Sequence, residues 1–202
     1  GFVVPNSFVC VRNLAPLFAK HIGNDKPFVF EKPNHNMSIV KNQKTQKFTS
    51  NCMFMGAPKR NAVIKDMVDY LRQRNTNPHY NAEGDFFGYT SKWLDNEVAR
   101  NHINLVDGIY IGVKTVDKTP VLIENLLEEE PIVFCNKRTH GIHIPEDEML
   151  SRSAYNWFPV TSINNLLNTK LNITKYLRLG IAEPENKEVQ KTEDQLRTVV
   201  SI

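Results

Sequence analysis

The most regular pattern in the chain is an apolar stripe of helical period over residues 61–74. Val63, Met67 and Leu71 recur every four residues, and charged side chains occupy the opposite face. Residues 84–100 form a second amphipathic segment, whose aromatic and aliphatic side chains gather on one side. We therefore predict two amphipathic helices, at about 61–74 and 84–100.

Shorter apolar runs, bounded by Pro, Asn and Gly, are typical of buried strands. They predict strands at residues 8–11, 28–30, 51–56, 132–135 and 142–145, and either two short strands or one bent strand over 103–113. Short helices are predicted at 14–21, 121–127, 146–152, 162–169 and 174–179, with an exposed loop over 32–50. The expected fold class is α/β, with a short mixed sheet flanked by helices.

Length and charge then limit the classes of protein. The 202 residues suit one domain, which we place at 1–182, followed by a charged C-terminal tail at 183–202. Hydrophobic residues make up 41% and no apolar run is long enough for a membrane span. The 25 Lys and Arg nearly balance the 22 Asp and Glu. We therefore expect neither a nucleic-acid partner nor a membrane span.

The cysteines and the start of the chain bear on its origin. Cys10, Cys52 and Cys135 are few and widely spaced, which favours buried free thiols in a reducing compartment such as the cytoplasm. The sequence opens on the strand-like Phe2-Val3-Val4 without an initiator Met or a signal sequence. Such an opening is expected of a fragment, a processed chain or one with residues missing upstream.

Common catalytic loops are missing from the sequence. It contains no G-x-G-x-x-G, no G-x-x-x-x-G-K-[ST] and no G-x-S-x-G. The dinucleotide-binding, P-loop and serine-hydrolase classes therefore have no support.

Two carboxylates next to a predicted helix start are the main candidates for chemistry. Glu83 and Asp85 flank Gly84, where a loop can bring both side chains to a cleft at the carboxyl edge of the sheet. Carboxylates suit acid–base work or a hard divalent cation. The alternative is structural, since anions also stabilise the positive N-terminus of a helix.

Histidines and basic residues give the remaining candidates. His140 and His143 are three residues apart, so in a strand they face opposite ways unless Gly141 makes a bend. Arg60, just before the first long helix, could bind a phosphate at the helix N-terminus or could be an ordinary surface cation. The tryptophans, Trp93 and Trp157, are predicted to anchor the core.

Several segments also resemble a known family. Residues 1–14 resemble the segment in which nucleotide-sugar glycosyltransferases of the DXD-containing sugar-transferase group carry Gly-Gly-x-Tyr-x-Asp-x-Asp. Residues 51–65 are similar to a later strand, turn and helix of that group. Residues 83–94, 108–112 and 141–145 resemble a set of related proteins of large DNA viruses.

The resemblance implies a fold and a cofactor. It implies the C-terminal part of a GT-A type glycosyltransferase fold, with a nucleotide-binding part upstream. In the family, the paired aspartates hold Mn²⁺ or Mg²⁺ against the diphosphate of the sugar donor. This chain has Pro5-Asn6-Ser7 at those positions. The resemblance therefore implies a viral, glycosyltransferase-like domain that is catalytically degenerate or incomplete.

If such a domain is active, the resemblance gives roles to the candidate residues. Asp85 would be the base or acceptor-orienting carboxylate, assisted by Glu83. His143, His140 and Arg60 would contact the donor diphosphate or its metal, and the substrate would be a nucleotide sugar.

The alternative comes from another functional class. A structural or interaction protein, such as a minor capsid component, would keep the fold for its surface and bind other virion or host proteins. The predicted location of the chain is therefore an intracellular reducing compartment (the cytoplasm) or the virion.

Overall fold

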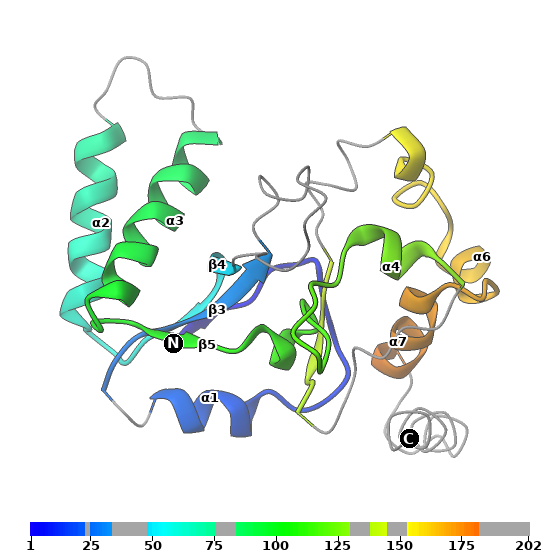
Figure 1. Ribbon diagram of the computed structural model, residues 1–202, viewed down its shortest axis with the longest axis horizontal. Coiled ribbons are helices and arrows are strands. Elements are labelled where there is room, and N and C mark those ends of the chain that lie inside the picture. Colours follow the sequence, from blue (N-terminus) through cyan, green and yellow to red (C-terminus); the bar gives the residue numbers. More distant parts are fainter. Residues whose placement is uncertain (23–24, 34–47, 76–83, 130–137, 145–152, 182–202) are drawn as a thin grey trace. The chain divides into compact units, whose positions relative to one another are not determined.

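The computed structural model describes residues 1–22, 25–33, 48–75, 84–129, 138–144 and 153–181 (Figure 1). The chain divides into two compact units. Unit 1 comprises Gly1–Pro5 and Leu14–Gly108, and unit 2 comprises Asn6–Asn13 and Ile109–Ile202. The architecture is α/β, with helices and a small, open mixed sheet, which confirms the expected fold class at this level.

Unit 1 is built on a four-stranded sheet with the order β1-β4-β3-β5. Its strands are β1 (Phe2–Val3), β3 (Phe28–Pro33), β4 (Phe48–Gly56) and β5 (Asn104–Val106). β4 runs antiparallel to both of its neighbours, whereas β3 and β5 are parallel. The register of β3 against β4 shifts between Val29 and Phe30, which is a local irregularity of the β-bulge kind.

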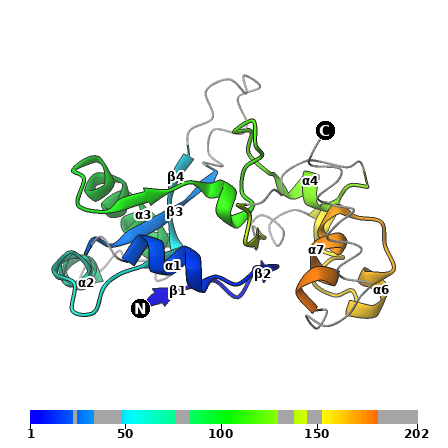
Figure 2. The same cartoon turned by 90° about the horizontal axis from the view of Figure 1, so that it is seen from below.

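Phenylalanine rings cover one face of this sheet. Phe18 of α1 (Ala15–Ile22) stacks on Phe2 with the ring centroids 3.8 Å apart, and it also contacts Phe28 and Phe54. Phe54 meets Phe30 edge to face at 4.6 Å, a geometry that aromatic quadrupoles favour. In Figure 2, α1 lies on the near side of the sheet. The four rings of Phe18, Phe28, Phe30 and Phe54 are almost completely buried, so this layer is a main part of the core of unit 1.

Two antiparallel helices pack on the other face. α2 (Ala62–Asn75) and α3 (Gly84–Ala99) lie side by side (Figure 1) and confirm the two predicted amphipathic helices. Side chains alternate along a strand, so Val29 points away from the phenylalanine layer and joins Met55, Leu94 and Ile103 under these helices. Trp93 packs against this cluster, as predicted for a core anchor.

Unit 2 contains a short ladder and several short helices. β2 (Phe8–Cys10) pairs antiparallel with β6 (Gly141–His143). The helices are α4 (Ile123–Leu127), α6 (Ile163–Leu167) and α7 (Asn172–Ile181), with the 3-10 turn η4 at Ser153–Tyr155. The 3-10 turn η3 (Gly108–Ile111) begins at the last residue of unit 1. The core of this unit is a mainly aliphatic cluster, called here the aliphatic cluster, made of Val121, Ile123, Leu126, Leu127, Ile142, Ile144, Ile173 and Tyr176.

Some local predictions are wrong. Residues 103–113 contain one strand, β5, followed by the 3-10 turn η3 rather than a second strand. The predicted loop over 32–50 is shorter at both ends, because β3 continues to Pro33 and β4 begins at Phe48. Cys10 is exposed rather than buried, and Trp157 is 37% exposed rather than an interior anchor.

Other predictions are confirmed, and some concern residues that the structure does not describe. The short helices expected at 14–21, 121–127, 162–169 and 174–179 correspond to α1, α4, α6 and α7. The strand predicted at 132–135, the helix at 146–152, Cys135 and the tail at 183–202 lie outside the described residues. In the part of the chain that the structure describes, no helix has both the length and the apolar character needed to cross a membrane.

Candidate functional site

Asn6 and Ser7 lead directly into the ladder of unit 2. Asn6 is exposed and Ser7 is partly buried, and β2 follows them at once. The main-chain carbonyl of Ser7 accepts a hydrogen bond of 2.8 Å from the amide of Ile144. Phe8 is registered with His143 on β6. The fold therefore brings His143 next to the segment Asn6–Ser7, although about 135 residues separate them in the sequence.

His140 lies beyond the other end of this ladder. Its Nδ1 is 2.8 Å from the main-chain carbonyl oxygen of Asn13. Because a carbonyl only accepts, Nδ1 carries the hydrogen and Nε2 is the nitrogen left for another partner. The main-chain oxygen of His140 accepts from the amides of Val11 and Arg12. These bonds fix the histidine ring and its backbone on the side of Asn13, away from Ser7.

The two histidines do not converge on one ion. Ile142 is completely buried in the aliphatic cluster, and His143, the next residue along β6, is only half-buried and faces the other way. Over the described ranges, no group of three or more His, Cys, Asp or Glu side chains is arranged to hold a metal.

The metal that the family resemblance implies does not fit these residues. Mn²⁺ and Mg²⁺ prefer carboxylate oxygens. The side chains at hand are the amide of Asn6, the hydroxyl of Ser7 and the single imidazole of His143, of which none is anionic. This donor set is unsuited to a hard divalent cation.

The predicted carboxylates belong to unit 1. Asp85 is in the first turn of α3, and the description of the chain does not extend to its side chain; Glu83 lies outside the described residues. Arg60 is exposed, has a left-handed backbone with φ of 59°, and precedes α2. α2 has 14 residues, about 21 Å at 1.5 Å per residue, and runs antiparallel to α3 (Figure 1). Arg60 and Asp85 therefore start from opposite ends of the helix pair.

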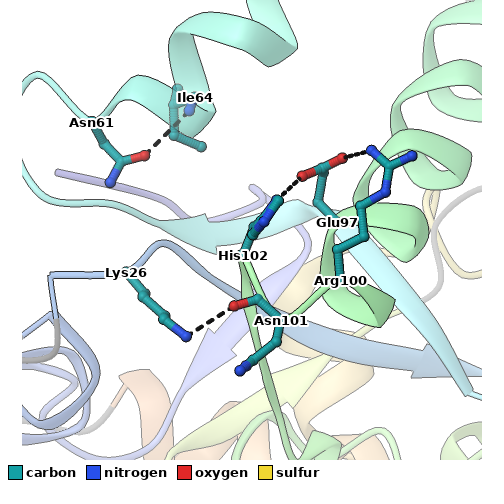
Figure 3. Close-up of polar contacts among 7 residues, drawn as sticks. All are labelled: Lys26, Asn61, Ile64, Glu97, Arg100, Asn101 and His102. Atoms are coloured by element: carbon teal, nitrogen blue, oxygen red, sulfur yellow. Dashed lines mark hydrogen bonds and ion pairs between the residues drawn. The ribbon is translucent and has the colours of Figure 1, made fainter.

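The turn containing Arg60 has a structural explanation of its own. Asn61 follows it and caps α2, because its Oδ1 accepts a hydrogen bond of 3.3 Å from the amide of Ile64. Its Nδ2 donates to the main-chain oxygen of Asp25 at 3.4 Å (Asn61 and Ile64 are drawn in Figure 3). The turn thus aligns the cap of α2 with the loop before β3.

Sequence reasoning missed a polar cluster at the C-terminal end of α3. Glu97 is 7% exposed, and its carboxylate accepts hydrogen bonds from Arg100 at 2.9 Å and from Nδ1 of His102 at 2.7 Å (Figure 3). The main-chain oxygen of Glu97 also accepts from the amide of His102. Asn101 makes this return possible through a left-handed φ of 60°, and its carbonyl accepts from Lys26 at 2.9 Å. The cluster ends α3 and directs the chain into β5.

A second carboxylate was also missed, at the end of the parallel strand pair. Phe30 is registered with Val106, so Glu31 and Asp107 take the next positions on β3 and after β5. Glu31 accepts a hydrogen bond of 2.8 Å from the amide of Gly108 through Oε2. Ligands of α/β sheets commonly bind at the carboxyl ends of such strands. The register of the two strands reveals this pair, and the sequence pattern alone could not.

Comparisons with known proteins give no relative. No protein-family model, no curated protein and no solved structure matches the chain significantly.

Proposed function

We propose that this chain is a glycosyltransferase-like domain, related to viral proteins that use nucleotide sugars, with a degenerate metal position. The observation that carries the proposal is the pairing of β2 with β6. It makes His143 a neighbour of Asn6–Ser7, the segment that resembles the donor-binding motif. The small mixed sheet of unit 1 supports the proposal only through the α/β class that it requires.

The chemistry at this position differs from that of a metal-dependent transferase. A diphosphate leaving group needs compensation of its negative charge. At Asn6–Ser7 that compensation would come from hydrogen bonds of the amide, the hydroxyl and the His143 ring rather than from a metal. Donor recognition would then be weak and nearly independent of Mn²⁺. The proposal for this donor position does not depend on Asp85 or Glu83, which belong to unit 1.

Isothermal titration calorimetry of the full chain with UDP-glucose and GDP-mannose, with and without Mn²⁺, tests the proposal. We expect saturable binding of one donor with Kd of about 0.1–1 mM, and Mn²⁺ should change that Kd less than about twofold. Exchanging His143→Ala should weaken binding by about 3–10-fold, the value of one hydrogen bond. His102→Ala, a histidine in unit 1, is the matched control and should leave Kd unchanged.

Two results would contradict the proposal. If neither donor gives saturable heat, the chain does not have the proposed nucleotide-sugar function. If His143→Ala and His102→Ala weaken donor binding equally, the donor position is not at β6.

The second candidate is a non-catalytic interaction protein, which a surface of unit 2 favours. Trp157, Val160 and Ile163 are 37%, 83% and 49% exposed within one short stretch of chain. Exposed large apolar side chains are a common feature of protein contact surfaces. If calorimetry shows no donor binding, and Val160→Asp abolishes a stoichiometric assembly of the chain with a partner protein, this second function replaces the first.

A further inference from the structure

Residues Asn172, Ile173 and Thr174 match the acceptor pattern Asn-x-Thr for N-linked glycans. That pattern normally implies a surface loop. Here the three residues begin α7, and they are only 2%, 0% and 0% exposed. An apparent modification site is therefore part of the interior of unit 2.

Asn172 is bonded through its main chain and through both ends of its side chain. Its Nδ2 donates to the main-chain oxygen of Asn125 at 2.8 Å, and its Oδ1 accepts from Nζ of Lys175 at 3.0 Å. Its main-chain amide donates to the oxygen of Glu128 at 2.9 Å. Asn172 thus joins the start of α7 to α4 and to the residue that follows α4.

The hydroxyl of the acceptor pattern is equally enclosed. Oγ1 of Thr174 is 2.7 Å from Oγ1 of Thr169 and 3.2 Å from the main-chain oxygen of Leu166. Between the two polar residues, Ile173 belongs to the aliphatic cluster of unit 2. All three residues of the pattern therefore contribute to packing.

A glycan would need space that the folded unit lacks. Attachment replaces one hydrogen of Nδ2 by the first carbon of the sugar, and the second hydrogen could still donate to Asn125. The sugar ring would nevertheless have to lie beside an atom of a residue that is 2% exposed. Close-packed interiors have no void of that size, so neighbouring side chains would have to leave the core.

We propose that glycan attachment at Asn172 and folding of unit 2 exclude one another. Asn172 is a structural residue, and the folded chain is the unglycosylated chain at this position. A chain that folds before it meets a glycosylating enzyme keeps Asn172 unmodified, whereas a chain glycosylated first cannot complete unit 2.

The experiment directs the full chain through a eukaryotic secretory pathway behind a cleavable signal sequence. Ser38→Ala removes the other Asn-x-Ser/Thr pattern, at Asn36, so that one acceptor remains. Mass spectrometry of the peptide containing Asn172, with and without N-glycosidase, gives the occupancy in the soluble monodisperse fraction and in the retained or aggregated fraction. Leu126→Ala, which opens a cavity in the same cluster, keeps more of the chain unfolded.

We expect the glycan at Asn172 to be at least about tenfold less frequent in the soluble fraction than in the retained fraction. In Leu126→Ala, occupancy of the total chain should rise. A soluble, cooperatively folded chain with the glycan at Asn172 would overturn the proposal. So would an unmodified Asn172 in the unfolded Leu126→Ala chain, because burial would then not be what protects it.

Discussion

Different interactions stabilise the interiors of the two units. Unit 1 has four paired strands, whose ladders satisfy the main chain, and its interior relies on phenylalanine rings and on aliphatic side chains under α2 and α3. Among its described residues, unit 2 has a three-residue ladder and one isolated β-bridge, between Lys114 and Pro120. Its helices are tied together by side chains that bond to main-chain groups, such as Asn172 to Asn125 and Arg178 to Leu167.

This difference suggests where each unit is vulnerable. Where ladders are long, the main chain is satisfied by repetition, and apolar volume limits stability. Where ladders are short, single amides and hydroxyls satisfy buried carbonyls, so one polar substitution has a large effect. The chain offers a natural probe for each case, because Trp93 is in unit 1 and Trp157 is in unit 2.

The largest effect should come from the phenylalanine layer. Phe54→Ala removes a ring that is 0% exposed and contacts both Phe18 and Phe30. We expect a loss of about 3–5 kcal/mol in the free energy of unfolding. Urea unfolding followed by fluorescence of Trp93, in a Trp157→Phe background, measures it. Val68→Ala, at a position that is 38% exposed, is the control with an expected change below about 0.5 kcal/mol.

A polar substitution should have the next largest effect, in unit 2. Asn172→Ala leaves the partly buried main-chain oxygen of Asn125 without this donor. We expect a loss of about 1–3 kcal/mol, measured by fluorescence of Trp157 in a Trp93→Phe background. Asn164→Ala, an exposed position on α6, is the matched control. A loss no larger than that of the control would mean that the polar bonds of unit 2 contribute little.

The smallest expected effect is a loss of stability of unit 1 when the pH is lowered. Burial, and then the charge of Lys20, lowers the pKa of His21, which packs against Phe28. Its ordinary value is 6.5, so the unfolded chain binds the proton more readily. Stability from this group is therefore present above about pH 6.5 and is lost as the pH falls below it. The change should stay under about 1 kcal/mol, because solvent screens a partly exposed ring.

His21→Gln checks this assignment. The substitution should flatten the loss of stability between pH 7 and pH 5 when Trp93 is followed, with little change when Trp157 is followed. An unchanged pH profile would show that another group carries the dependence.

Periodicity was enough to predict the elements with long, one-sided patterns. The stripe of Val63, Met67 and Leu71 located α2 to within a residue or two, because only a helix gathers those positions on one face. Short apolar runs were less informative. Ile109 and Ile111 alternate like a strand, yet they belong to the 3-10 turn η3, since tertiary packing decides the conformation of so short a segment.

The candidate site was predictable only in part, because tertiary packing decides which residues meet. His143 could be noticed in the sequence, but its closeness to Asn6–Ser7 follows from a pairing between distant strands. The contact of Glu97 with His102 depends on the left-handed backbone of Asn101, and no pattern of side chains predicts this contact. Lys32 is a strand residue that falls in the predicted loop, because its polarity hides the continuation of β3.

The division of unit 2 into two separate stretches of chain has a consequence for biosynthesis. Cys10 leaves the ribosome before its ladder partner Gly141, which follows about 130 residues later, on the order of ten seconds at about 5–20 residues per second. Until then β2 has no native partner on β6. A chaperone that recognises short extended apolar segments would therefore find Phe8–Cys10 exposed during that interval.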